Sequence, residues 1–132
     1  MEYITAFVVT GAIFAIIDAI WLISTAQFYK KQLGGMLLAK PNFVAAILFY
    51  LVYIAGILVF VLLPALESNH AWKAGVQGAF FGLVAYATYD LTNLATLKKW
   101  PLKITVIDLV WGMLATGVSA IIAFYVLKGW VL

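Results

Sequence analysis

The sequence predicts an all-α membrane protein, with four transmembrane helices in one bundle and short loops between them. Of its 132 residues, 67% are hydrophobic and only 10% are charged, whereas about a quarter of the residues in soluble domains are charged. The mean hydropathy is +1.11, and polar groups are too few to cover a soluble fold of this size. We therefore expect one domain, residues 1–132, that lies mostly in lipid.

Four apolar runs are long enough to cross about 30 Å of hydrocarbon at about 1.5 Å per helical residue. These runs are Tyr3–Ser24, Asn42–Leu63, Lys73–Leu97 and Pro101–Leu127. Pro41 and Pro101 lie where helices are expected to start, and Pro64 is expected to end the second helix. The first run has Glu2 where a secretory signal needs positive charge, so we expect it to be a retained helix.

The lysines predict the orientation of the chain in its membrane. The first and third connections and their flank carry six of them, Lys30, Lys31, Lys40, Lys98, Lys99 and Lys103, and the other two are Lys73 and Lys128. Lysine-rich loops usually face the cytoplasm. We therefore expect a multi-pass protein with both termini on the extracytoplasmic side.

The first connection is the longest, and residues 28–38 mix lysines with large apolar side chains. This composition predicts a short segment at the membrane interface. A mobile lid that hinges at Gly34 and Gly35 is the alternative. In the third helix, Ala74, Gly78 and Gly82 are spaced four apart, which lets another helix approach closely, either within the chain or from a second copy.

Composition excludes several classes of site. The chain has no cysteine and one histidine, so disulfides, thiolate sites and multi-histidine metal sites are ruled out. We expect no cofactor. We also expect no nucleic-acid partner, because the lysines lie beside apolar spans. Three aspartates with Asn93 leave a hard cation such as Mg²⁺ open as an alternative, although we predict no metal site.

Three aspartates fall inside the predicted helices, where each costs about 2.5–3.5 kcal/mol on membrane insertion. Asp18 lies six residues before the expected end of its helix, Asp90 seven before, and Asp108 seven after the start of its own. All three would therefore lie about 9–11 Å inside the cytoplasmic boundary. One aspartate alone is most simply helix–helix glue, but three at one depth predict a functional polar site.

Aromatic and amide groups are expected at the same level. Tyr86, Tyr89, Asp90 and Asn93 follow helical spacing on one face, and the second helix adds Tyr50 and Tyr53. Trp21 and Trp111 each follow an aspartate by three residues, although membrane-interface anchoring explains them equally well. The predicted ligand-binding residues are Asp18, Trp21, Tyr50, Tyr53, Tyr86, Tyr89, Asp90, Asn93, Asp108 and Trp111.

These segments also carry a resemblance. The block from Tyr86 to Leu97 with Trp100-Pro101, together with the D-x-x-W segments at Asp18 and Asp108 and the Y-x-x-Y segment at Tyr50, resembles a family of small bacterial membrane proteins, domain of unknown function 2177. The resemblance covers nearly the whole chain. It implies the four-helix membrane fold in a bacterial inner (plasma) membrane and favours the same residues, but it implies no activity.

Three functions fit these residues. Buried carboxylates with aromatic neighbours suit binding or transport of a small cationic or hydrogen-bonding amphiphile, and transport by alternating access would favour a homo-oligomer. Asp18, Asp90 and Asp108 are also candidate catalytic residues of an acid/base enzyme acting on a lipid or isoprenoid. In the third alternative, the chain is an accessory subunit whose polar cluster is purely structural.

Overall fold

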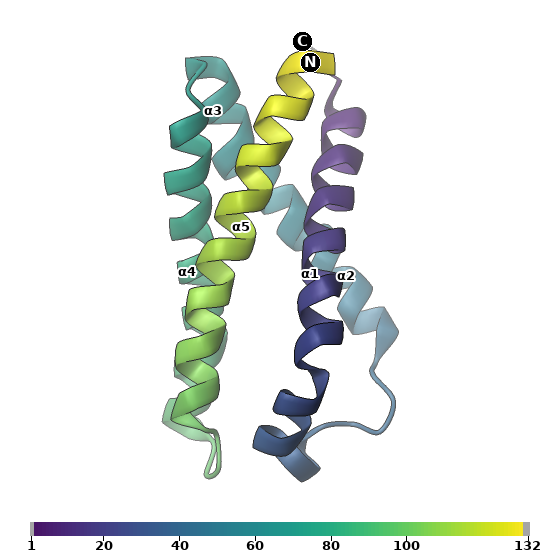
Figure 1. Ribbon diagram of the computed structural model, residues 1–132, viewed down its shortest axis with the longest axis vertical. Coiled ribbons are helices and arrows are strands. Elements are labelled where there is room, and N and C mark those ends of the chain that lie inside the picture. The colour runs from purple at the N-terminus through teal and green to yellow at the C-terminus, as the bar shows by residue number, and fades with distance from the viewer. Residues whose placement is uncertain (1, 131–132) are drawn as a thin grey trace.

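The computed structural model describes residues 2–130 as a bundle of long helices (Figure 1). In chain order its elements are α1 (Tyr3–Leu33), η1 (Gly34–Met36), α2 (Phe43–Ile57), η2 (Leu58–Leu62), α3 (Leu63–Ser68), α4 (Ala71–Thr96) and α5 (Leu102–Trp130). The elements α2, η2 and α3 form one continuous helix. The bundle thus has four long helices, as the sequence predicts.

Three of these helices, Tyr3–Met36, Phe43–Ser68 and Leu102–Gly129, are long and apolar enough to cross a membrane. The fourth, α4, is the least apolar, but its 26 residues reach about 39 Å and it lies alongside α5. Large apolar side chains such as Ile23 and Val52 point outward, 81% and 72% exposed. An apolar outer surface of this kind needs lipid around it, which confirms the predicted all-α membrane fold.

Helix α1 is longer than expected, because it ends at Leu33 and not at Ser24. Its last turn is held by packing, since Leu33 is buried with Trp100 and Ile104 at the start of α5. Gly34 then ends the helix with a positive φ of 53°, and its N–H bonds to the carbonyl of Lys30. The first half of the predicted interfacial segment is therefore a packed part of α1.

The prediction that Pro64 ends the second helix is wrong. The helix takes up a π turn, η2, in which the N–H of Leu63 donates to the carbonyl of Leu58, five residues back. Pro64 follows this π turn directly and has no N–H to donate, so it interrupts the backbone hydrogen bonding at the junction of η2 and α3 without ending the helix. The chain continues to Ser68 and turns at Asn69, whose φ is 59°.

Helices α4 and α5 meet along the small residues that the sequence singled out. Ala74, Gly78 and Gly82 are buried, and the latter two face Gly112 and Thr116 of α5. A Cβ at Gly82 would stand only 2.0 Å from the carbonyl oxygen of Gly112. The small-residue stripe thus serves packing within the chain, as one of the two alternatives predicts.

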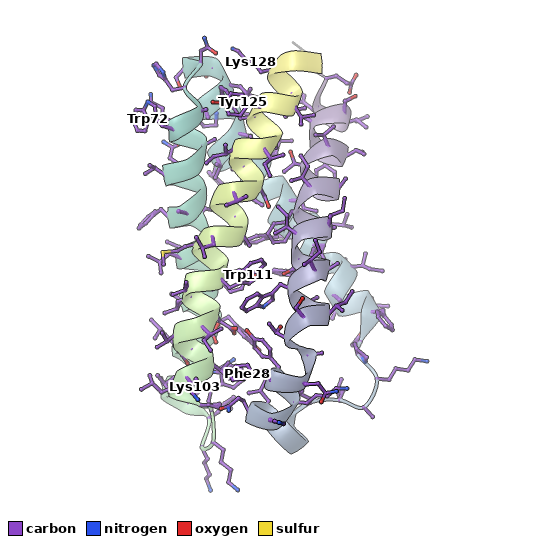
Figure 2. The ribbon with its side chains drawn as sticks, in the orientation of Figure 1. Phe28, Trp72, Lys103, Trp111, Tyr125 and Lys128 are labelled. Carbon is purple, nitrogen blue, oxygen red and sulfur yellow. The ribbon has the colours of Figure 1, made fainter. Side chains whose placement is uncertain are left out.

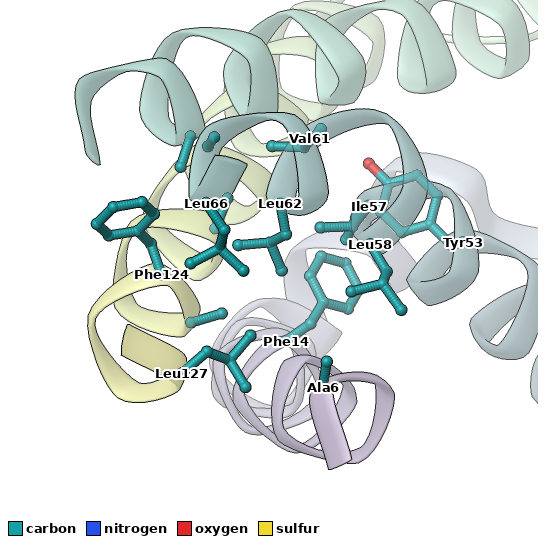
Figure 3. Packing of buried hydrophobic residues seen from close by; sticks show 14 of the residues in the cluster. Ala6, Phe14, Tyr53, Ile57, Leu58, Val61, Leu62, Leu66, Phe124 and Leu127 are labelled. Atoms are coloured by element: carbon teal, nitrogen blue, oxygen red, sulfur yellow. The ribbon is translucent and has the colours of Figure 1, made fainter. Parts of the chain in front are cut away.

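The apolar core lies toward the end of the bundle that holds both termini. There Phe14, Leu62, Phe124 and Leu127 are nearly or wholly inaccessible to solvent (Figure 3). Toward the opposite end, where the α1–α2 and α4–α5 connections lie, α5 and α1 diverge and α2 runs obliquely behind α1 (Figure 1). We call this opposite end, which carries Lys30, Lys31, Lys98, Lys99 and Lys103, the lysine-rich end. The divergence leaves room for polar and aromatic side chains between the helices.

Candidate functional site

Asp18 of α1 is held by groups from two other helices. The carboxylate is 7% exposed and accepts a hydrogen bond from the Tyr50 hydroxyl of α2. Its other oxygen accepts from Nε1 of Trp111 on α5, at 3.3 Å. An aspartate inside a membrane helix must face the bundle interior and find donors, and Asp18 does both. It therefore ties α1, α2 and α5 together.

Asp108 of α5 has its own partner, which the sequence did not indicate. Its carboxylate, 9% exposed, accepts a hydrogen bond from the hydroxyl of Tyr29. Tyr29 lies on the part of α1 that extends beyond the expected helix end. The tyrosine was missed because its segment was assigned to a loop.

Asp90 of α4 is the most deeply buried of the three, with no exposed surface. Its carboxyl lies beside that of Asp108 and near the Trp100 indole. Within the described residues, however, neither of its oxygens has a hydrogen-bond partner, and Nε1 of Trp100 donates to Thr105 instead, at 3.1 Å. Buried carboxyl oxygens are nearly always hydrogen-bonded, so Asp90 differs in this respect from Asp18 and Asp108, whose carboxylates have donors.

The three aspartates do not lie at one level, which corrects the sequence-based expectation. Asp18 lies 15 residues before the end of α1, about 22 Å along the axis, because that helix extends to Leu33. Its partner Trp111 lies three residues beyond Asp108 on α5, or about 4.5 Å. Asp90 and Asp108 therefore form a pair nearer the lysine-rich end, and Asp18 lies about one turn deeper.

A stack of two indoles connects α1 and α5 beside these carboxylates. The rings of Trp21 and Trp111 are 4.3 Å apart and nearly parallel, at 7°. Trp111 lies between the two helices at mid-height (Figure 2). The predicted alternative of membrane-interface anchoring does not describe this pair, because each ring packs on the other. Because Nε1 of Trp111 donates to Asp18, the stack lies directly beside that carboxylate.

A cavity of about 180 Å³ lies between these groups. Its lining residues are Asp18, Trp21, Leu22, Tyr29, Tyr86, Asp108 and Trp111. Two carboxylates from different helices thus share one small space with four aromatic rings. Tyr86 completes the wall, with its ring against Gly112, where a Cβ would be only 2.5 Å from the ring.

The other predicted site residues lie outside this cavity. Tyr53 is buried deeper, where its hydroxyl pairs with that of Thr116 at 2.7 Å. Tyr89 is 55% exposed, with its ring edge-on to Trp100 at 5.6 Å. Asn93 lies beside Tyr89. The structure therefore brings Asp18, Trp21, Tyr86, Asp108 and Trp111 around one cavity and Tyr50 against its rim, but not Tyr53, Tyr89, Asp90 or Asn93.

A hard cation held by all three aspartates does not fit this geometry. Within the described residues, no group of three or more acidic or histidine side chains is close enough to hold a metal ion. The reason is the stagger of about one helical turn between Asp18 and the pair of Asp90 and Asp108. The cavity instead offers two separate carboxylates and flat aromatic surfaces, an arrangement that suits an organic cation.

Comparison with known proteins gives one match. The model of a family described as "Predicted membrane protein (DUF2177)" matches residues 3–125. No curated protein and no protein of solved structure matches the chain.

Proposed function

The chain belongs to the DUF2177 family of predicted membrane proteins, and from its site we propose that it binds or transports a small cationic or hydrogen-bonding amphiphile. The observation behind this proposal is the cavity in which Asp18 and Asp108 face a common space lined by aromatic rings. A carboxylate shielded from water attracts a cation strongly. Two unit charges about 4 Å apart interact by about 4 kcal/mol at an effective dielectric constant near 20.

The size of the cavity limits the ligand. About 180 Å³ is below the roughly 300–1,000 Å³ of pockets that enclose whole drug-sized molecules. An ammonium or small alkylammonium group fits, whereas a complete lipid does not. Because the rings of Trp21 and Trp111 stack on each other, a cation in the cavity can lie over the outer face of one of them, which adds cation–π attraction of about 0.5–2 kcal/mol. The cavity therefore suits the charged head of an amphiphile, with the tail outside.

The distribution of the lysines favours one orientation of the bundle in the membrane. With both termini on the extracytoplasmic side, the lysine-rich end faces the cytoplasm of a bacterial inner membrane, as the positive-inside rule favours. The cavity then extends from mid-height, at Asp18 and Trp111, toward the cytoplasmic end, at Asp108 and Tyr29. A chain of four helices is small for alternating access, so transport would require a homo-oligomer.

The adjacent carboxyls of Asp90 and Asp108 favour a second candidate, an acid/base enzyme that acts on a lipid or isoprenoid. One carboxyl of such a pair can donate a proton while the other accepts one. Turnover of a labelled lipid that is lost in Asp90→Asn would support the enzyme. Cation binding without turnover would support the binding protein.

Thermal unfolding of the purified protein in dodecyl maltoside tests the binding proposal. Hexyltrimethylammonium should raise the midpoint temperature, because a ligand at 100 times its dissociation constant stabilises by about 2.7 kcal/mol. Hexyl sulfate, which has the same tail and the opposite charge, should not. The shift should be lost in Asp18→Asn and Asp108→Asn and kept in Glu67→Gln, an exposed acid of α3. Equal shifts with both amphiphiles, or an unchanged shift in Asp18→Asn, would refute the proposal.

A further inference from the structure

The bundle has a second opening, on the side where α2 and α4 face each other. Helix α4 packs against η2 and α3 but hardly against α2, because α2 runs away from it toward the lysine-rich end. The backbone of α2 comes close to α4 at Gly56, where a Cβ would stand 2.6 Å from the ring of Phe81, and one turn further along α2 the ring of Tyr53 lies edge-on to that of Tyr86 at 6.3 Å. Beyond Tyr53, toward the lysine-rich end, the two helices are separated by a groove.

The groove has a volume of about 380 Å³ and is lined by Phe49, Ala85, Tyr86 and Tyr89. It is nearly devoid of polar surface and about twice as large as the polar cavity, at 180 Å³. Phe49 and Tyr89 at its edges are 48% and 55% exposed, so the groove opens on the outer surface of the bundle. In a membrane that surface faces lipid chains.

Tyr86 belongs to both spaces. It lines the groove together with Phe49, and it lines the cavity together with Asp18 and Asp108. Its hydroxyl lies near Asp18. Tyr86 thus lies between the apolar groove, which is open to the bilayer, and the cavity that holds the carboxylates of Asp18 and Asp108.

The opposite side of the cavity, between α1 and α5, is spanned by the stacked rings of Trp21 and Trp111. Within the described residues, Leu22 is the one aliphatic side chain that lines the cavity. At the same depth the α2–α4 side presents an apolar groove. A hydrocarbon chain attached to a headgroup in the cavity therefore finds its larger apolar surface between α2 and α4.

We propose that the ligand is a membrane lipid with an amine headgroup, which enters laterally between α2 and α4. Its headgroup lies in the cavity at Asp18 and Asp108, past Tyr86, and its chain lies in the groove lined by Phe49 and Ala85. This inference rests on the proposed function and adds the substrate class and the route. A hydrocarbon chain gains no hydrophobic free energy on moving from the bilayer into the groove, because both are apolar. Selectivity among lipids therefore comes from the headgroup, and the groove contributes van der Waals packing with the chain.

Photo-crosslinking in nanodiscs tests the route. The probes are phosphatidylethanolamine and phosphatidylglycerol that carry the same diazirine-labelled chain, and labelled peptides are mapped by mass spectrometry. The amine lipid should label the segments around Phe49 and Ala85 at least fivefold more than the phosphatidylglycerol does. Equal labelling by the two lipids, or labelling of α1 around Leu22 in place of the groove, would overturn the inference.

Two matched variants sharpen the test. Ala85→Trp fills the groove and should reduce labelling by the amine lipid at least fivefold, and the smaller Ala85→Leu should reduce it less. Ala95→Trp introduces the same ring on α4 at an exposed position outside the groove and should leave labelling unchanged. An equal loss of labelling in Ala85→Trp and Ala95→Trp would contradict the proposal that the lipid chain lies in the groove.

A water-soluble cation separates this inference from the proposed function. Tetramethylammonium has no chain, so it should raise the unfolding temperature of the wild type and of Ala85→Trp alike if the cavity binds cations. If it does so while the amine lipid fails to label the groove, the lateral route is wrong and the cation site stands. If tetramethylammonium has no effect on either protein, the cation site itself is wrong.

Discussion

Replacing Gly82 by alanine tests the closest contact in the bundle. The added Cβ would stand 2.0 Å from the carbonyl oxygen of Gly112 and 2.8 Å from Oγ1 of Thr116. Real Cβ atoms essentially never approach closer than 3.0 Å, and the carbonyl oxygen is backbone and cannot rotate away. Helices α4 and α5 must therefore separate by about 1 Å. Overpacking of this kind costs about 1–3 kcal/mol, against a gain in helix propensity of at most about 1 kcal/mol.

Because a 2.0 Å approach to backbone is severe, the cost should be about 3 kcal/mol, so Gly82→Ala should destabilise the protein by about 2 kcal/mol after the propensity gain of about 1 kcal/mol. For a chain of this length that corresponds to a fall of about 6–12 °C in the midpoint of thermal unfolding, measured by circular dichroism in dodecyl maltoside. Gly129→Ala is the matched control, because a Cβ there meets no atom within 4 Å. A midpoint for Gly82→Ala within 2 °C of the wild type would refute the close approach of α4 and α5.

Three further changes have defined outcomes. Tyr29→Phe removes the hydroxyl that bonds to a carboxylate and should lower the free energy of unfolding by about 1.5–3 kcal/mol; wild-type stability would argue against that bond. In a double-mutant cycle, Trp21→Leu and Trp111→Leu should couple by about 0.5–1.5 kcal/mol because their rings stack, and purely additive effects would contradict the stack. Because the chain has no cysteine, Gly35→Cys and Asn69→Cys can be labelled singly, and an impermeant maleimide added to intact cells should react only with the latter. The reverse pattern would invert the proposed orientation.

The fold could be predicted from the sequence because lipid imposes few alternatives. Apolar runs of sufficient length must be helical in a bilayer, and the inward direction of Asp18 and Asp108 follows from the cost of exposing a carboxylate to lipid. Helix ends were less predictable. Polar residues such as Ser24 suggest an end where α1 in fact continues to Leu33, held by tertiary packing that the local sequence does not show.

The helix ends in turn limited the prediction of the site. Tyr29 lies 11 residues, three helical turns, after Asp18, so a continuous α1 would have placed both on one face. The supposed common level of the aspartates depended on the same boundary. At Pro64, a π turn preserved a helix that a proline was expected to end, and nothing in the local sequence signals such a turn.

Side-chain direction was the other limit. Tyr86, Tyr89 and Asp90 fit one broad helical face, but consecutive residues differ by about 100° around the axis. Asp90 therefore points into the bundle while Tyr89 points outward, 0% and 55% exposed. Periodicity identified the helix surface correctly and could not decide which tyrosine contacts the cavity.

A double-mutant cycle on cation binding tests the central claim most directly. If Asp18 and Asp108 act on one ligand in one cavity, Asp18→Asn and Asp108→Asn should each abolish most of the affinity for hexyltrimethylammonium measured by calorimetry. The double variant should then lose little more, so the coupling free energy should exceed about 1 kcal/mol. Strictly additive losses would show that the two carboxylates do not share a ligand.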